Sequence, residues 1–217
     1  MSTYLPERSF TASLKYTDEG RVFTFDFSKL TLETEEVVPG NTNPCSYART
    51  EEDDHLNLTT QPLEPLKLYF LCRRWDDGDV HYEIKARHSY KQDYNVLKNL
   101  LVTRHLKVGL PNMPVTSVDL YIQPGIANRH ISGWRLYQEN GNVKTLLDAT
   151  SLKPGTSYGQ VWLKAPTREY VGFVEKVRVV NQWHARASCG TPGAIGLNKP
   201  TPVALELYVH EVNIPEP

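Results

Sequence analysis

Leu205-Glu206-Leu207-Tyr208-Val209 is one of three copies of a single pattern in this chain; the other two are Leu66-Lys67-Leu68-Tyr69-Phe70 and Val118-Asp119-Leu120-Tyr121-Ile122. Each copy places a charged residue between two aliphatic residues, followed by a tyrosine and another large apolar residue. This period of two predicts a β-strand with one buried face and one face in water. The pattern favours a mainly β, antiparallel protein over a nucleotide-binding α/β enzyme.

Two hairpins are predicted around turn sequences. Apolar and polar residues alternate over 10–16 and 23–27, on either side of Asp18-Glu19-Gly20. Residues 66–75 and 80–87 flank Asp76-Asp77-Gly78-Asp79, where Asp-Gly is a strong turn signal. Further strands are predicted near 30–38, 115–123, 131–138, 142–147, 158–164, 170–182 and 202–212. Many short strands at this spacing predict an antiparallel β-sandwich that is jelly-roll-like.

One amphipathic helix is predicted over residues 89–107. Ser89 and Gln92 match a capping box at its start. Gly109 can end it. Apolar residues recur at helical spacing at Tyr90, Tyr94, Leu97, Leu100 and Leu101.

A long surface loop is predicted near residues 39–64. Turn-forming residues fill 39–44, and an acidic run follows at 51–54. No composition shift divides the chain, so residues 1–217 are interpreted as a single domain with this loop on its surface.

Composition indicates a globular protein without a membrane-spanning segment. The 217 residues are 40% hydrophobic and 23% charged, and no stretch approaches the length of a membrane helix. No signal peptide is recognised at the start, which favours the cytoplasm. The three cysteines, Cys45, Cys72 and Cys189, indicate free thiols; one disulfide with a leftover thiol is the alternative.

The charge distribution argues against nucleic acid, and its asymmetry along the chain is interpreted first as an effect of the acidic loop. The net charge is −1, so no global field attracts nucleic acid or an anionic membrane. Residues 1–100 carry 12 Lys and Arg against 17 Asp and Glu, whereas residues 101–217 carry 12 against 8. This asymmetry could orient subunits in a homo-oligomer, or it could reflect the acidic loop alone.

The catalytic and metal motifs tested in the sequence are incomplete. The Gly-rich stretch 190–196 lacks the Gly-Lys-Ser/Thr ending of a phosphate-binding loop. His81 and Glu83 would share one face of a strand, but a zinc site needs a third protein ligand. His184 and Cys189 carry no local signature of a catalytic pair, and no Gly-x-Ser-x-Gly motif is present. We therefore expect no cofactor and no metal, and we favour a protein that is not an enzyme.

Aromatic residues beside polar residues are the most suggestive functional feature. The chain has 12 Tyr and 4 Trp. A flat ring can stack on a sugar, while carboxylate, amide and guanidinium groups bind the sugar hydroxyls. The same composition marks protein–protein hot spots. Two tryptophans are expected to be exposed, and the candidate ligand-binding residues are Trp75, Asp76, Asp77, Asp79, Asn181, Trp183 and Arg186.

The leading functional hypothesis is lectin-like binding of glycans through loops at one end of the sandwich. The alternative is a self-assembling structural subunit, such as a viral or particle protein. A hydrolase whose site is not visible in the sequence is a further alternative. The expected partner is a glycan or a protein.

Overall fold

The computed structural model describes residues 2–34, 45–62, 66–90, 100–109, 121–125, 133–165, 170–188 and 201–216. This part of the chain is mainly β, with two short 3-10 helices and no α-helix. The helices are η1 (Pro6–Arg8) and η2 (Ala149–Ser151). The strands are β1 (Ser2–Tyr4), β2 (Phe10–Asp18), β3 (Arg21–Thr34), β4 (Ser46–Thr59), β5 (Lys67–Trp75), β6 (Val80–Tyr90), β7 (Leu100–Gly109), β8 (Tyr121–Gly125), β9 (Arg135–Asn140), β10 (Val143–Leu146), β11 (Ser157–Lys164), β12 (Gly172–Val179), β13 (Gln182–Ser188), β14 (Thr201–Pro202) and β15 (Leu205–Val212).

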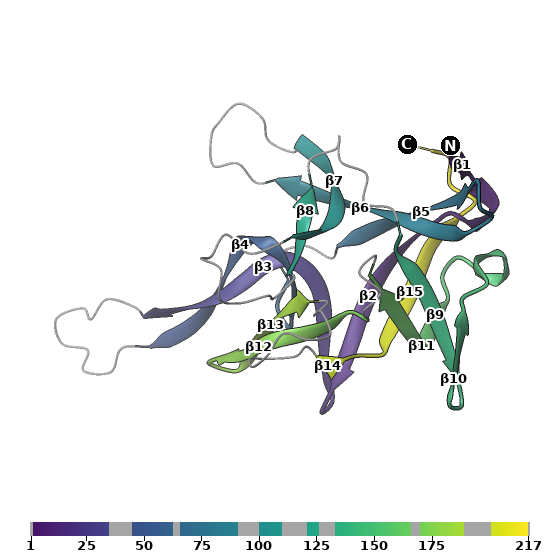
Figure 1. Cartoon of the computed structure of the whole chain (residues 1–217). Coiled ribbons are helices and arrows are strands. Elements are labelled where there is room, and N and C mark those ends of the chain that lie inside the picture. The colour runs from purple at the N-terminus through teal and green to yellow at the C-terminus, as the bar shows by residue number, and fades with distance from the viewer. Residues whose placement is uncertain are drawn as a thin grey trace, which may run out of the picture.

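All strands of the described residues belong to one connected sheet, and they pair antiparallel (Figure 1). From β5 the pairing runs through β6, β7, β8, β13, β4 and β3 to β2, and β2 pairs with β5 again. A second branch leads from β2 through β15, β11 and β9 to β10 at its end. The predicted mainly β, antiparallel fold is confirmed.

The alternating pattern positions the core as predicted. Leu66, Leu68 and Phe70 are buried, whereas Lys67 and Tyr69 between them are partly exposed. The same alternation holds along β15, where the odd-numbered residues 205–209 face inward. The Phe10 and Phe70 rings stack at 4.8 Å between centroids. Burying these side chains removes apolar surface from water, which is the main favourable term in folding.

The predicted helix over 89–107 is wrong where the structure describes it. Residues 89–90 belong to β6 and residues 100–107 to β7, and these two strands pair along 85–90. Residues 91–99 lie outside the described ranges. The stretch 100–108 also has a period of two, with Leu100, Val102, Leu106 and Val108 separated by other residues. Tertiary pairing of β7 with β6 and β8 therefore overrides the helical interpretation of the leucines.

The predicted loop near 39–64 is also corrected. Residues 46–59 form β4, which pairs with β3 over most of its length. An acidic run has low strand propensity, but ladder hydrogen bonds to a 14-residue neighbour hold it extended. Similarly, the predicted strand 170–182 contains a turn, because β12 ends at Val179 and β13 begins at Gln182.

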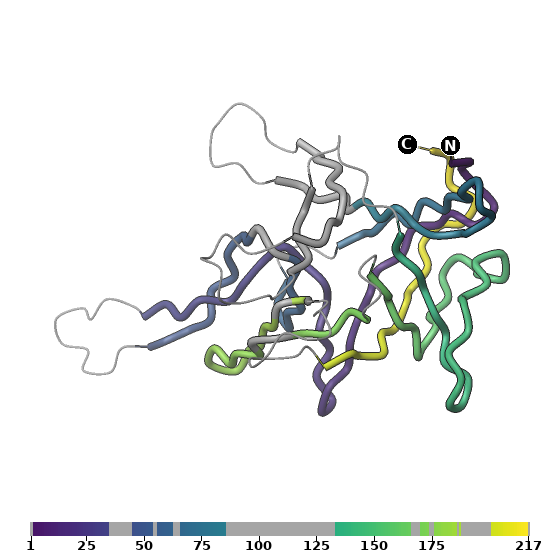
Figure 2. The backbone as a smooth tube through the Cα atoms, in the orientation of Figure 1, coloured from purple at the N-terminus to yellow at the C-terminus, as the bar shows by residue number. Residues whose placement is uncertain are grey.

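The two ends of the chain lie side by side (Figure 2). The Tyr4 hydroxyl donates to the backbone oxygen of Ile214 at 2.5 Å. The first strand, β1, pairs with the last three residues of β5. Across the ranges described, no helix has the length and apolar character needed to cross a membrane.

Candidate functional site

The four tryptophans have different environments, and this difference separates core residues from candidate binding residues. Trp134 is fully buried in the core, at 0% exposure, and exchanges backbone hydrogen bonds with Tyr82. Trp75 is 39% exposed. Trp162 and Trp183 are partly buried, and each ring has cations close to it.

Trp75 lies at the end of β5 and begins the tight turn that leads into β6. The backbone N–H of Gly78 donates to the oxygen of Trp75 at 2.9 Å, and Trp75 N–H donates to Asp79 O at 2.9 Å. Gly78 has a φ of 85°, a backbone conformation that glycine adopts without strain. The turn therefore presents residues 76–79 to solvent beside an exposed indole ring. We call residues 75–79 the Trp75 turn.

Charged and polar groups border this ring. The Trp75 and His81 rings lie 5.4 Å apart between centroids at a tilt of 46°. The Asp79 carboxylate accepts a hydrogen bond from Arg135 and lies 3.8 Å from His81 Nδ1. Burial lowers the pKa of His81, although Asp79 opposes this effect. The imidazole is therefore neutral at pH 7, and it lies near the carboxylates of Asp79 and Asp77.

Trp183 lies in a different environment, which we call the Trp183 cluster. The guanidinium carbons of Arg21 and Arg178 lie 5.3 and 5.9 Å from the centre of its ring. Lys176 Nζ lies 5.2 Å from the same centre and pairs with Asp18. Cations close to an indole are attracted by the negative ring face. The expectation that Trp183 is exposed is not met, because the side chain is only partly exposed.

The structure divides the predicted binding residues into two groups. Asn181 lies beside the Trp183 cluster, where its side-chain oxygen accepts from Arg178 at 3.2 Å. Arg186 lies in β13 opposite Val174 of β12 and Asn57 of β4. The β5–β6 turn and the β12–β13 turn lie on opposite sides of the molecule in Figure 1. The two groups therefore do not share a cleft.

A third aromatic surface was not selected from the sequence. Lys144 Nζ lies 3.4 Å from the centre of the Trp162 ring and 4.9 Å from that of Tyr170. Lys164 Nζ lies 5.5 Å from Tyr137 and 5.4 Å from Tyr170. These five residues form the Trp162 face on β9, β10 and β11, with Tyr170 bridging to Lys164.

Strand register brings the Trp162 face together. Trp162 is opposite Tyr137, and Lys144 is opposite Glu139, which accepts a hydrogen bond from the Trp162 indole N–H at 2.7 Å. The alternation of buried Val161 and Leu163 does indicate that Trp162 points outward. The register between three strands is not visible in the sequence, so the cluster could not be predicted from it.

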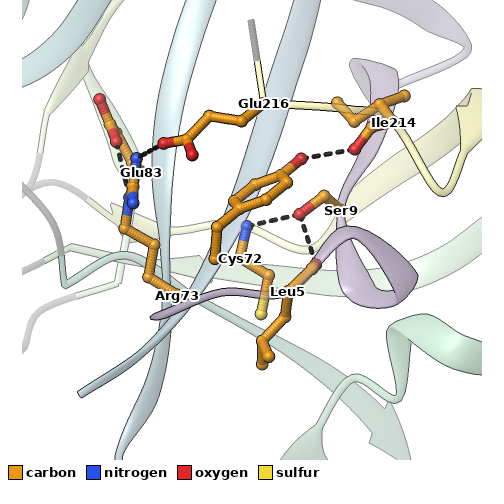
Figure 3. Close-up of polar contacts among 8 residues, drawn as sticks. Leu5, Ser9, Cys72, Arg73, Glu83, Ile214 and Glu216 are labelled. Atoms are coloured by element: carbon orange, nitrogen blue, oxygen red, sulfur yellow. Dashed lines mark hydrogen bonds and ion pairs between the residues drawn. The ribbon is translucent and has the colours of Figure 1, made fainter. Parts of the chain in front are cut away.

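The polar network in Figure 3 is structural and ties β5 to both ends of the chain. The Ser9 hydroxyl donates to Leu5 O at 2.8 Å and accepts from the backbone N–H of Cys72 at 2.9 Å. Arg73 donates to Glu83 at 3.1 Å and also pairs with Glu216. This network holds the strand that leads into the Trp75 turn.

Residue types that serve in catalysis occur at the Ser13–His210 contact and at Cys72 in the part of the chain described. There, no three His, Cys, Asp or Glu side chains gather in a way that could hold a metal ion. Ser13 Oγ lies 2.8 Å from His210 Nε2, but it also donates to Leu66 O at 3.1 Å. A serine nucleophile must give its single proton to the base, so the bond to Leu66 O competes with activation. Burial raises the pKa of Cys72 to about 11, so its thiol is protonated at pH 7.

Comparisons of this chain with protein-family models, with curated proteins and with solved structures return no match.

Proposed function

We propose that this protein is a non-enzymatic binding protein that recognises glycans, in the manner of a lectin, at the Trp75 turn. The observation that supports this is the exposed Trp75 ring beside carboxylates of the same turn. Trp162 and Trp183 have cations over their rings, whereas no cation–ring contact involving Trp75 occurs among the described residues. Trp75 is therefore the ring best placed to stack on a sugar.

The chemistry around Trp75 suits a polyhydroxylated ligand. The indole face offers apolar surface to the C–H face of a sugar ring. Carboxylates accept hydrogen bonds from hydroxyl groups, and such charge-assisted bonds are stronger than neutral ones. Asp77 Oδ1 accepts from the backbone N–H of Asp79 at 2.9 Å, which orients this carboxylate at the turn. Arg135, which pairs with Asp79, supplies further donors.

A jelly-roll-like β-sandwich remains our interpretation of the architecture that carries this turn. Antiparallel strands around a shared apolar core support it. In such folds, end loops are common binding positions, because a rigid scaffold holds them.

The test is to screen the labelled full chain on a glycan array and to measure the best oligosaccharide by calorimetry. We expect Trp75→Ala to weaken binding at least tenfold, and Trp75→Phe to retain part of the affinity. A tenfold loss is about 1.4 kcal/mol of binding free energy. Trp183→Ala is the matched control, because it also removes a tryptophan side chain, but from the Trp183 cluster and not from the Trp75 turn. The proposal is wrong if no glycan binds, or if Trp75→Ala folds and binds as the parent does.

A second candidate function is a self-assembling structural subunit. The observation that favours it is a two-stranded ribbon that projects from the rest of the described structure (Figure 1). It consists of residues 28–34 of β3 and 46–52 of β4, and we call it the β3–β4 arm. Leu32 in the arm is 63% exposed, and a projecting ribbon with exposed apolar residues is a common means of contact between subunits. Light scattering after size exclusion separates an assembly from a monomer.

A further inference from the structure

We infer that the β3–β4 arm of one copy docks on the Trp162 face of a second copy of this chain. The inference rests on the second candidate function, self-assembly, and names the two surfaces that would meet.

The base of the arm is covered, since Ser28 and Leu30 are 0% and 4% exposed, but its outer part has no further strand partner in the described structure. Among the described residues, β3 pairs with β2 only over 21–24, and β4 pairs with β13 only over 57–59. Beyond these segments the two strands pair only with each other. An isolated two-stranded ribbon is marginally stable in water, and both of its edges offer unpaired backbone groups. A surface on another molecule would stabilise it.

The two faces of the arm differ in character. One face carries Leu32 opposite Ala48, and Leu32 is largely exposed. The opposite face carries the exposed Glu33–Arg49 ion pair at 2.9 Å. Near the base of the arm, Glu52 lies on the Leu32 face, whereas Glu51 lies on the other face opposite Lys29. In the described structure neither of these carboxylates belongs to an ion pair. The arm thus offers an apolar side chain and negative charge.

The Trp162 face offers the complementary groups. Its two ammonium groups, on Lys144 and Lys164, contact aromatic rings, and within the described ranges neither is paired with a carboxylate. The neighbouring strand β10 ends the sheet path, and its outer edge is free among the described strands. Val143 and Leu146 in β10 are 61% and 59% exposed. Leu146 is opposite Tyr137, so it adjoins the aromatic rings.

These properties match in three ways. Glu52 shares the arm face with Leu32 and would meet the lysines while Leu32 meets apolar side chains, and the ribbon edge can add to the edge of β10 that is free among the described strands. The arm and β10 lie on opposite sides of the molecule in Figure 1, so a chain cannot fill its own face. The contact is therefore heterologous: each copy gives one arm and receives one, which produces a ring or an open filament.

The test uses charge reversal in two variants of the full chain. One variant carries Glu51→Lys and Glu52→Lys in the arm, and the other carries Lys144→Glu and Lys164→Glu in the face. Size exclusion with light scattering should show that the parent assembles and that each variant alone does not. A 1:1 mixture should assemble again, because the reversed arm fits the reversed face and the unchanged arm of one fits the unchanged face of the other. Lys153→Glu, at an exposed lysine of the turn before β11, is the control and should assemble as the parent does.

A second variant does not depend on the folding of the charge-reversed chains. Leu32→Asp changes a largely exposed side chain and should reduce the assembled fraction at least tenfold at equal concentration. If the parent assembles and Leu32→Asp and both charge reversals assemble equally well, the docking inference is overturned while self-assembly stands. If the parent is monomeric at every concentration, both fail. A mixture that stays monomeric when its two folded components are monomeric also overturns the inference.

Discussion

Arg73 Nε donates to Glu83 Oε2 at 3.1 Å, and this ion pair joins β5 to β6 in a largely buried position. The Glu83 side chain is 2% exposed and that of Arg73 is 17% exposed. Arg73 also lies 5.8 Å from the ring centre of Tyr4 and pairs with Glu216, so it connects both termini to the sheet. The stability of the chain ends therefore depends on a charge that is removed from water.

We predict that Arg73→Met lowers the free energy of unfolding by about 3 kcal/mol, because it removes a charged partner from the buried carboxylate of Glu83. The double variant Arg73→Met with Glu83→Leu should recover much of this loss. Urea unfolding of the three proteins measures the difference. Arg49→Met breaks an exposed ion pair and should leave the midpoint unchanged. Equal losses in Arg73→Met and in the double variant would contradict the prediction.

Gly172 should not tolerate a side chain. A Cβ atom at this position would lie 2.2 Å from the backbone oxygen of Thr201, so β14 would have to move. We expect Gly172→Ala to destabilise the fold by about 1–3 kcal/mol, as overpacking does. Gly159→Ala is the matched control, because a Cβ there meets nothing within 4 Å. Thermal unfolding of both variants tests this, and an unchanged midpoint in Gly172→Ala would refute it.

Stability should fall as the pH drops below about 6.5, the ordinary pKa of histidine. Burial lowers the pKa of His81, and burial together with Lys67 lowers that of His210. Below pH 6.5 the unfolded chain binds protons on these rings while the folded chain does not, so acid favours unfolding. His81→Gln combined with His210→Gln should flatten the dependence between pH 7 and pH 5. A parallel slope in the variant and the parent would show that other groups are responsible.

The two described cysteines should react at different rates. Cys45 is exposed, whereas Cys72 is buried and its pKa is raised to about 11 by burial. Only the thiolate is nucleophilic, so iodoacetamide at pH 7.5 should modify Cys45 and spare Cys72. Peptide mapping by mass spectrometry reports each cysteine separately. Rapid modification of Cys72 in the folded protein would contradict the structure around Ser9 and Cys72.

Lys144→Met should weaken the β9–β10 hairpin slightly. The ammonium group lies 3.4 Å from the centre of the Trp162 ring, and an exposed contact of this type contributes about 0.5–1 kcal/mol. The indole emission of Trp162 should also change. We expect a small decrease in the urea midpoint for Lys144→Met and none for Lys153→Met. A more stable Lys144→Met protein would show that the contact is not favourable.

Local alternation allowed much of the fold to be predicted. The hairpin β2–β3, the hairpin β5–β6 and the strand β15 were all identified from the sequence, because residues two apart share a face and must be buried together. The helix over 89–107 was mispredicted because its leucines fit both the helical spacing and the period of two of a strand. The acidic strand β4 was missed because its partner, not its own propensity, holds it extended.

The candidate sites show the same division between local and tertiary information. The sequence alone determined that Trp75 ends a strand at an exposed acidic turn, since turn chemistry is local. It also determined which residues alternate into the core. Only the tertiary structure decided that Lys144 and Lys164 lie over Trp162, Tyr137 and Tyr170, and that the Trp75 turn and the Trp183 cluster are apart. Those relationships depend on strand order and register, which long-range pairing sets and which no short stretch of sequence encodes.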